Sequence, residues 1–287
     1  MYNEQGFKSN FGKYSVPKAL QELSVINQRL KEEGRNLDDG LFFYLVHEEE
    51  YRYFNTPCDV VVFGNIGADG IHYGLLTDFG MVHTLDEAPV VCVTPMDFDC
   101  PVRIIAENLE HFLSVNMNDS TLFYNHFRTE GEYDEFVHRE IIGYDGLPYR
   151  PNEEDKRRRE AIQQQVRERI KLPHIGLPYR YVQEQQAKRD RQAWIRTRAL
   201  LHVLRPPGQD EAPYTGELFP IREDGIIDTD AISGFLEHAD ATAIQALVRD
   251  IQMHALSGMT DLQDLLLPAL RSVGLYDESE RLRLSME

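Results

Sequence analysis

Cysteine is scarce in this chain of 287 residues: Cys58, Cys92 and Cys100 are its three cysteines, and none belongs to a C-x-x-C pair. All three lie in or beside apolar runs, a placement typical of buried, reduced thiols in a cytosolic protein. The sequence also lacks any run of about 18 consecutive apolar residues, which predicts that no helix spans a membrane. Residues 1–12 are polar and show no secretory pattern. We therefore expect a cytoplasmic protein without a disulfide or a cysteine-bound metal.

Basic side chains are also fewer than acidic ones: the chain has 30 lysines and arginines and 48 aspartates and glutamates, and its net charge is −18. The balance changes along the chain. Residues 1–150 carry 11 basic and 25 acidic side chains, residues 151–205 carry 14 and 7, and residues 206–287 carry 5 and 16. The acidic bulk argues against a nucleic-acid-binding protein, because phosphate binding needs positive surface. Only the basic middle segment leaves a nucleic-acid-contacting adaptor open as an alternative.

Motifs of catalytic and nucleotide-binding sites are absent as well. No G-x-S-x-G elbow is present, so this form of serine nucleophile is not indicated. Neither G-x-G-x-x-G nor G-x-x-x-x-G-K-[ST] occurs, so a phosphate-binding loop is not indicated either. No cysteine has neighbours that would lower its pKa and activate it. The sequence therefore favours a protein with no catalytic residues and no cofactor.

The apolar pattern of the first half predicts an α+β domain that spans residues 1–145. Residues 17–34 are expected to be helical, because apolar residues from Leu20 to Leu30 recur at three- and four-residue spacing and Gly34 is suited to end the helix. Glycine and proline clusters separate the strand-like runs that follow. Strands are expected at residues 41–46, 60–63, 71–77 and 89–93, and further helices at residues 101–115 and 122–141. A helix, several strands and more helices are typical of the α+β class.

The second half is expected to be helical in three parts. They are a basic segment at residues 146–205 with helices at 153–171 and 181–204, a proline-containing linker at 206–224, and a small helical bundle at 225–287. The sequence Gly-Leu-Pro-Tyr-Arg occurs twice, at residues 146–150 and 176–180. We interpret this repeat as two similar transitions between helix and loop, with a paired binding motif as the alternative.

The most basic run of the chain, from Lys156 to Arg159, has acidic residues on both sides. Glu153, Glu154 and Glu160 stand at helical spacing from it, which predicts ion pairs within the chain in preference to a phosphate-binding patch. A further alternative is that the basic helices dock on the acidic N-terminal domain, which would explain the alternation of charge without an outside partner.

A glycine-rich segment, residues 64–70, separates the second and third expected strands. It contains Gly67, Asp69 and Gly70, and its closing Asp-Gly pair is typical of a hairpin turn. Asp69 and the nearby His72, Asp78 and His83 could in principle bind a divalent metal and serve a hydrolase. No H-E-x-x-H or comparable spacing supports that alternative. The favoured interpretation is a turn shaped by its aspartate, with histidines at the edge of the sheet.

The order of features from residue 60 to residue 115 resembles the SUKH superfamily, a bacterial and fungal group of glucan-synthesis regulators and toxin-immunity proteins. The matching features are an apolar strand, the turn with Gly67 that ends in Asp69 and Gly70, a strand with an aromatic residue, another apolar strand, and a helix carrying Phe112 and Leu113. The sequence departs from the family at residues 33–37, where many members have an Asn-Gly-Gly turn.

The resemblance implies a non-enzymatic cytosolic module, with a mixed or antiparallel sheet, that acts by binding another protein. An acidic surface suits this role, because complementary charge speeds the encounter with a basic partner. We therefore expect an immunity or regulatory protein whose partner is a protein such as a toxin domain, with no role for a membrane. A metal-dependent hydrolase and a nucleic-acid-contacting adaptor are the alternatives.

Overall fold

The computed structural model describes residues 9–46, 51–97, 99–143, 152–209, 211–221, 227–253 and 260–286. The fold belongs to the α+β class, as predicted, with 51% of the residues in helices and 11% in strands. A five-stranded sheet lies near the N-terminus and helices make up the C-terminal part. Within these residues, no helix combines the length and the apolar composition that crossing a membrane requires.

The described residues include seven strands and ten α-helices, with the following bounds. The strands are β1 (Tyr44–Leu45), β2 (Val60–Asn65), β3 (His72–Leu76), β4 (Val90–Val93), β5 (Val102–Ala106), β6 (Ala193–Ile195) and β7 (Val203–Leu204). The helices are α2 (Lys18–Glu32), α3 (Asp38–Leu41), α4 (Leu109–Asp119), α5 (Glu130–Gly143), α6 (Glu153–Arg169), α7 (Pro178–Gln192), α8 (Thr229–Leu236), α9 (Ala241–Met253), α10 (Thr260–Ser272) and α11 (Tyr276–Met286).

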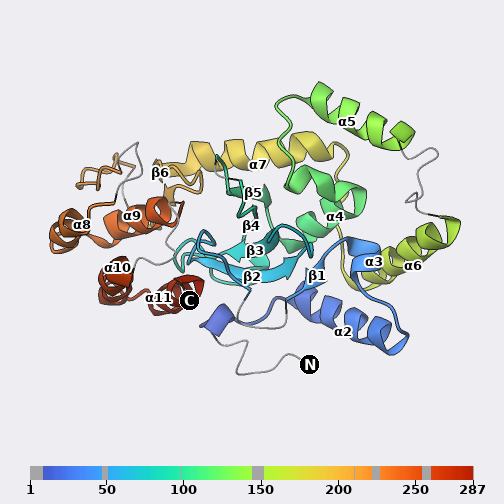
Figure 1. The fold of residues 1–287 in the computed structure, drawn as a ribbon, viewed down its shortest axis with the longest axis horizontal. Coiled ribbons are helices and arrows are strands. Elements are labelled where there is room, and N and C mark those ends of the chain that lie inside the picture. The colour runs from blue at the N-terminus through green and yellow to red at the C-terminus, as the bar shows by residue number, and fades with distance from the viewer. Residues whose placement is uncertain are drawn as a thin grey trace.

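The first five strands form an antiparallel meander in the order β1–β2–β3–β4–β5. Strands such as β2 and β4 are apolar at consecutive positions. Because neighbouring side chains of a strand point to opposite faces, the sheet has apolar residues on both faces. One face carries Phe63 and Tyr73 into the main core, to which α2, α4 and α6 contribute. The other face carries Val62 and Val91 into a smaller core that includes Leu201. Figure 1 shows the sheet at the centre of the molecule, with helices around it.

Helix α2 forms as predicted. Its apolar stripe from Leu20 to Leu30 is buried. At its end the Arg35 N–H donates to the Leu30 carbonyl at 2.8 Å, and the Gly34 N–H donates to the Lys31 carbonyl at 3.1 Å. Gly34 has a φ of +70°, which a residue without a Cβ adopts at little cost. This pattern is the Schellman motif, in which glycine ends a helix.

The helix predicted at residues 101–115 is wrong in its first half. The segment Val102–Ala106 is strand β5, which pairs with β4. Ile104 belongs to one apolar cluster and Ile105 to the other, so neighbouring side chains point to opposite faces, as in a strand. The helix begins later, and its cap is Asn108, whose side chain accepts a hydrogen bond from the His111 N–H at 3.0 Å. Four of the five residues of this segment are apolar and three of them are β-branched, so the pattern fits the periodicity of a helix as well as that of a strand. Pairing with β4 selects the strand.

Three other predicted elements are shorter than expected. The strand predicted at residues 41–46 is the end of α3 followed by the two-residue strand β1. The helix predicted at residues 122–141 is the end of a 3-10 turn followed by α5. The helix predicted at residues 181–204 is most of α7 followed by the β6–β7 hairpin. A positive φ angle at Phe42 separates α3 from β1, and further positive φ angles at Leu200 and His202 lie in the connection between β6 and β7. Left-handed residues interrupt regular elements, and sequence periodicity does not register them.

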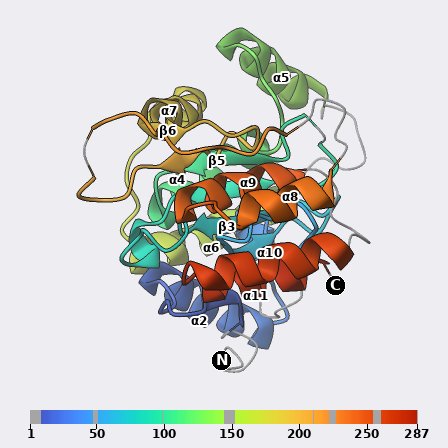
Figure 2. The ribbon, with the colours of Figure 1, turned by 90° about the vertical axis from the view of Figure 1, so that its left-hand side faces the viewer.

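The C-terminal helices form within the predicted range 225–287 and share an apolar cluster with two residues that flank the strands. Their apolar cluster includes Cys58 and Phe79 from the first half of the chain. The Cys58 N–H donates to the Gln252 side chain of α9 at 2.9 Å, and Nε of Arg281 on α11 donates to the Cys58 carbonyl at 2.6 Å. In Figure 2, which views the molecule from the left-hand side of Figure 1, helices α9, α10 and α11 lie between the viewer and the sheet. The bundle predicted at residues 225–287 therefore packs on the sheet domain, and the domain boundaries themselves stay a prediction.

The repeated Gly-Leu-Pro-Tyr-Arg segment is described in one copy. In residues 176–180, Leu177 stands at the N-cap and Pro178 is the first residue of α7. A proline suits this position, because its missing N–H would have no partner there. The first copy, residues 146–150, lies outside the described residues.

Candidate functional site

Two connections leave the sheet at the same end. One row of paired residues runs across all five strands, through Tyr44, Asn65, His72, Val93 and Val102. The turn at residues 66–71 and the β4–β5 connection both extend beyond this row. They therefore emerge next to each other on one side of the molecule.

This end of the sheet exposes apolar and acidic side chains together. We call the surface formed by Tyr44, Tyr53, residues 66–71, Met96, Asp97 and Asp99 the turn-end surface. The exposed fraction is 46% for Tyr44, 37% for Tyr53 and 68% for Met96, which are large values for such residues. Exposed aromatic residues and methionine next to a polar rim are typical of sites that bind another protein.

The turn itself depends on the residues that the sequence singled out. Gly67, Asp69 and Gly70 have φ angles of +76°, +52° and +68°. Such angles suit glycine, and aspartate tolerates them better than most residues. The Ile71 N–H closes the turn by donating to the Ala68 carbonyl at 3.0 Å.

The two glycines also make room for the exposed tyrosines. A Cβ at position 67 would lie 2.8 Å from Cε2 of Tyr44, and a Cβ at position 70 would lie 2.5 Å from Cζ of Tyr53. Real Cβ atoms are essentially never that close to another heavy atom. Glycine at both positions therefore lets the two rings lie directly against the turn.

Beneath the turn, His72 is fully buried and holds neighbouring segments together. Its Nδ1 lies 2.7 Å from the Gly70 carbonyl oxygen, and its Nε2 lies 3.0 Å from the Thr56 hydroxyl. Because a carbonyl can only accept, Nδ1 carries the proton, and Nε2 accepts from Thr56. The Thr56 hydroxyl oxygen in turn accepts from the Tyr53 N–H at 2.8 Å. Burial lowers the pKa of His72 to about 4, so the ring is neutral at neutral pH.

The aromatic side chains near His72 pack on it in two orientations. The ring of Tyr53 stacks on the imidazole with centroids 5.8 Å apart, and the ring of Tyr51 meets it edge-on at 5.7 Å. Tyr53 is thus an exposed side chain with a buried support.

The polar part of the turn-end surface is acidic. Asp69 and Asp99 are exposed. Burial alone would raise the pKa of Asp97, but hydrogen bonds from the Cys100 N–H and from His126 outweigh it and lower the pKa below its ordinary value. Asp97 is therefore ionised at neutral pH.

The C-terminal helices hold the segment that carries Tyr53. Arg52 donates to the Val60 and Pro57 carbonyls and, through Nε, to the Ser285 hydroxyl of α11 at 3.0 Å. Gln252 of α9 donates to the Thr56 carbonyl at 2.9 Å. The position of Tyr53 thus depends on residues more than 190 positions away in the sequence.

A buried ionic cluster lies below this segment, and nothing in the sequence pointed to it. Arg249 of α9 donates to Asp59 at 2.7 Å and to Asp78 at 3.2 Å, and Arg189 of α7 forms a two-armed ion pair with Asp78. All four side chains are buried. The guanidinium of Arg249 also lies over the ring of Phe79, 4.7 Å from its centroid. These contacts tie α7 and α9 to the strand ends.

The four residues considered for a metal site play different parts. Asp69 lies in the turn, His72 is committed to its two hydrogen bonds, Asp78 is paired with arginines, and His83 is exposed beyond β3. Across the described residues, no group of three or more histidines, cysteines, aspartates or glutamates could hold a metal ion. The structure therefore does not bring these residues together as a ligand set.

The cysteines are all free; Cys58 and Cys92 are buried, as predicted, whereas Cys100 is only half-buried. Burial raises the pKa of Cys92 to about 12, so its thiol is protonated and packs in strand β4 as an apolar group.

The basic helices form the ion pairs that the sequence predicted. Within α6, Lys156 pairs with Glu153 and Arg158 pairs with Glu154. Three further pairs join the basic helices to the first half of the chain: Arg169–Glu22, Arg180–Glu130 and Lys188–Glu107. These pairs lie where docking of the basic helices on the acidic first half would place them, and whether charge drives that docking stays a prediction.

Sequence reasoning found the turn but missed Tyr44, Tyr53 and Met96. Exposure and sheet register bring these residues together, and neither leaves a motif in the sequence. Three consecutive glutamates, residues 48–50, form an acidic run in the sequence that lies outside the described residues. No family model matches this chain, and no curated protein matches it.

Proposed function

We propose that this protein is a non-enzymatic binding module of the SUKH type, an immunity or regulatory protein that holds another protein at its turn-end surface. The observation that carries the proposal is the placement of Tyr53. Its exposed ring is held by the stack on His72, and its backbone by the hydrogen bond to Thr56.

A fixed, exposed tyrosine is a favourable contact for a protein partner. Tyrosine is enriched among the residues that dominate binding energy at interfaces, because it buries a large area at a small cost in side-chain entropy. When the ring is already held in place, even less freedom is lost on binding. Tyr44 and Met96 extend the apolar area on the same surface.

The charge of the surface favours a basic partner. Asp69, Asp97 and Asp99 belong to the same surface, and the whole chain carries a net charge of −18. Acidic groups at the rim of an interface speed the approach of a basic protein and disfavour an acidic one. A basic toxin domain has the chemistry that this surface would recognise.

The test compares three baits in capture from a lysate of the source organism. They are the unchanged protein, the variant Tyr53→Ser with Met96→Ser, and the control Tyr276→Ser. Tyr276 is a matched control, because it is 66% exposed on α11 and lies outside the turn-end surface. Circular dichroism and thermal unfolding first establish that the three baits are folded.

One basic protein should bind in equal molar amount to the unchanged protein and to Tyr276→Ser, and should be lost with the double variant. Its retention should fall as the salt concentration rises, because exposed charges are screened at high ionic strength. Capture by all three baits alike, or no stoichiometric partner on the unchanged protein, would overturn the proposal.

A further inference from the structure

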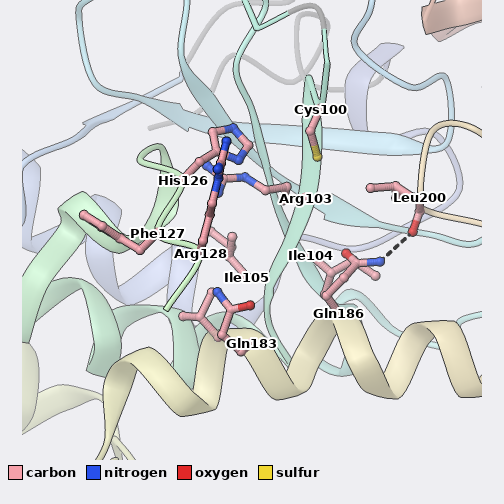
Figure 3. A pocket seen from close by; sticks show the side chains of 11 residues that line it. Cys100, Arg103, Ile104, Ile105, His126, Phe127, Arg128, Gln183, Gln186 and Leu200 are labelled. Carbon is pink, nitrogen blue, oxygen red and sulfur yellow. Dashed lines mark hydrogen bonds between the residues drawn. The ribbon is translucent and has the colours of Figure 1, made fainter. Parts of the chain in front are cut away.

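A cavity of about 190 Å³ lies between strand β5, helix α7 near Val182 and Gln183, and the loop that precedes α5. Figure 3 shows its labelled side chains: Arg103 and Ile105 come from β5, Arg128 from the loop, and Gln183 from α7. It is smaller than the roughly 300–1,000 Å³ of sites for drug-sized molecules. A ligand of this cavity would be a small one.

The lining of this cavity is unlike the rest of the protein in its charge. Two arginines, one histidine and two glutamines line it, and none of its lining residues is an aspartate or a glutamate. The chain as a whole carries 48 acidic residues against 30 basic ones. A wall without carboxylates is therefore a local reversal of the overall charge.

The arginines keep their charge available. Arg103 is held by hydrogen bonds to the Phe123 carbonyl at 2.7 Å and to the Asn125 carbonyl at 3.1 Å. Carbonyl oxygens orient the guanidinium without neutralising it. Arg128 is exposed, and its backbone N–H is bonded to Glu132. In the described ranges, neither guanidinium forms an ion pair with a carboxylate.

The other polar groups add little net charge. His126 pairs with Asp97, which lies outside the cavity lining, so any charge on this ring is balanced. Burial raises the pKa of the Cys100 thiol, which therefore stays neutral. The net positive charge of the cavity comes from Arg103 and Arg128.

The remainder of the wall is apolar. Ile104, Ile105 and Val182 line it although most of each side chain is buried in the apolar clusters, and Phe127 and Leu200 present more exposed apolar surface. Binding sites for small molecules combine such apolar walls with a few polar groups that fix orientation. A guanidinium binds an oxyanion through charge-assisted hydrogen bonds, which are stronger than those between neutral groups.

We propose that this cavity binds a small organic anion, whose carboxylate or phosphate group meets Arg103 and Arg128 and whose apolar body lies against Ile105 and Val182. The inference is independent of the partner proposed for the turn-end surface. It rests on the lining of the cavity alone.

Three probes of similar size distinguish the chemistry. Benzoate and phenyl phosphate carry the two oxyanions on the same ring, and benzamidine carries a cation in their place. Binding is followed by the methyl signals of Ile104, Ile105 and Val182 in ¹H–¹³C spectra of the full chain. At least one anion should shift these signals with a Kd of roughly 1 mM or below, and benzamidine should not. The tighter of the two anions identifies the head group as carboxylate or phosphate.

Two variants and a control locate the site. Arg128→Gln, at an exposed position, should weaken binding of the anion by about fivefold or more, since one charge-assisted contact is lost. Gln183→Trp, on the exposed side of α7, should block the cavity and abolish the shifts. Arg167→Gln removes the same charge from an exposed position of α6 that does not line the cavity, and should leave binding unchanged.

The proposal is overturned if benzamidine binds as well as the anions, or if neither anion shifts the three methyl signals. It is also overturned if Arg128→Gln and Arg167→Gln weaken binding equally, because a general loss of positive charge would then explain the effect.

Discussion

The ring of Tyr53 stacks on the imidazole of His72, with centroids 5.8 Å apart and planes inclined by 18°. One partner of this pair is exposed and the other is fully buried. The buried ring is itself fixed by the Gly70 carbonyl and the Thr56 hydroxyl. The pair thus joins a contact surface to the hydrogen-bond network below it, and a change in the buried half should alter both stability and binding.

The first prediction concerns the pH dependence of stability. The pKa of His72 is about 4 in the folded protein and 6.5 as an ordinary value. Between these pH values the unfolded chain binds more protons, so the stabilisation from neutral His72 is complete above pH 6.5 and is lost as the pH falls to 4. The loss amounts to about 3 kcal/mol, at 1.36 kcal/mol per pH unit.

The variant His72→Gln should lack this component. Its unfolding free energy, measured in urea from pH 4 to pH 7, should fall less steeply toward acid than that of the unchanged protein. His83→Gln is the control, because His83 is exposed and should leave the slope unchanged. Parallel curves for His72→Gln and the unchanged protein would show that His72 is charged, or solvated, in the folded state.

The second prediction concerns the turn. Gly70→Val should lower the unfolding free energy by about 1–3 kcal/mol, because valine is strained at a φ of +68° and its Cβ would overlap Tyr53. Gly208→Val separates the two causes, since Gly208 has a φ of +84° with no atom near its Cβ position. The Gly208 variant should lose less stability in urea denaturation. Equal losses would mean that the ring of Tyr53 does not lie against the turn.

The third prediction concerns the buried ionic cluster. Arg249→Met should cost about 3–5 kcal/mol, because it leaves Asp59 buried without its closest cation. Arg167→Met, at an exposed position, should change stability by less than about 0.5 kcal/mol.

The same variant tests whether the C-terminal helices unfold with the sheet. Because Arg249 joins α9 to Asp59 and Asp78, the unchanged protein should unfold in a single transition, and Arg249→Met should shift that whole transition. A separate early transition of the C-terminal helices in the unchanged protein would show that they fold on their own, against this account.

Much of the fold was predictable because local patterns agreed with the final packing. Helix α2 has a clear apolar stripe and a glycine stop, and strands β2, β3 and β4 are short apolar runs between turn residues. Strand β5 was missed because its residues fit a helical pattern equally well, and only the partner strand β4 selects the extended form.

The candidate site was predictable only in part. Gly67, Asp69 and Gly70 carry a turn signal in the sequence itself. Tyr53 takes its place through contacts with His72, 19 positions on, and its segment is braced by Gln252. Contacts of this length are set by the tertiary fold, and local sequence carries no trace of them.

Hydrogen exchange of the complex tests the central claim most directly, once a partner has been captured. Binding should slow exchange of the backbone amides at residues 66–71 and at Tyr53, and leave residues 276–286 of α11 at their rates in the free protein. Protection confined to α11 or to the basic helices, with no change at the turn, would contradict the assignment of the turn-end surface as the binding site.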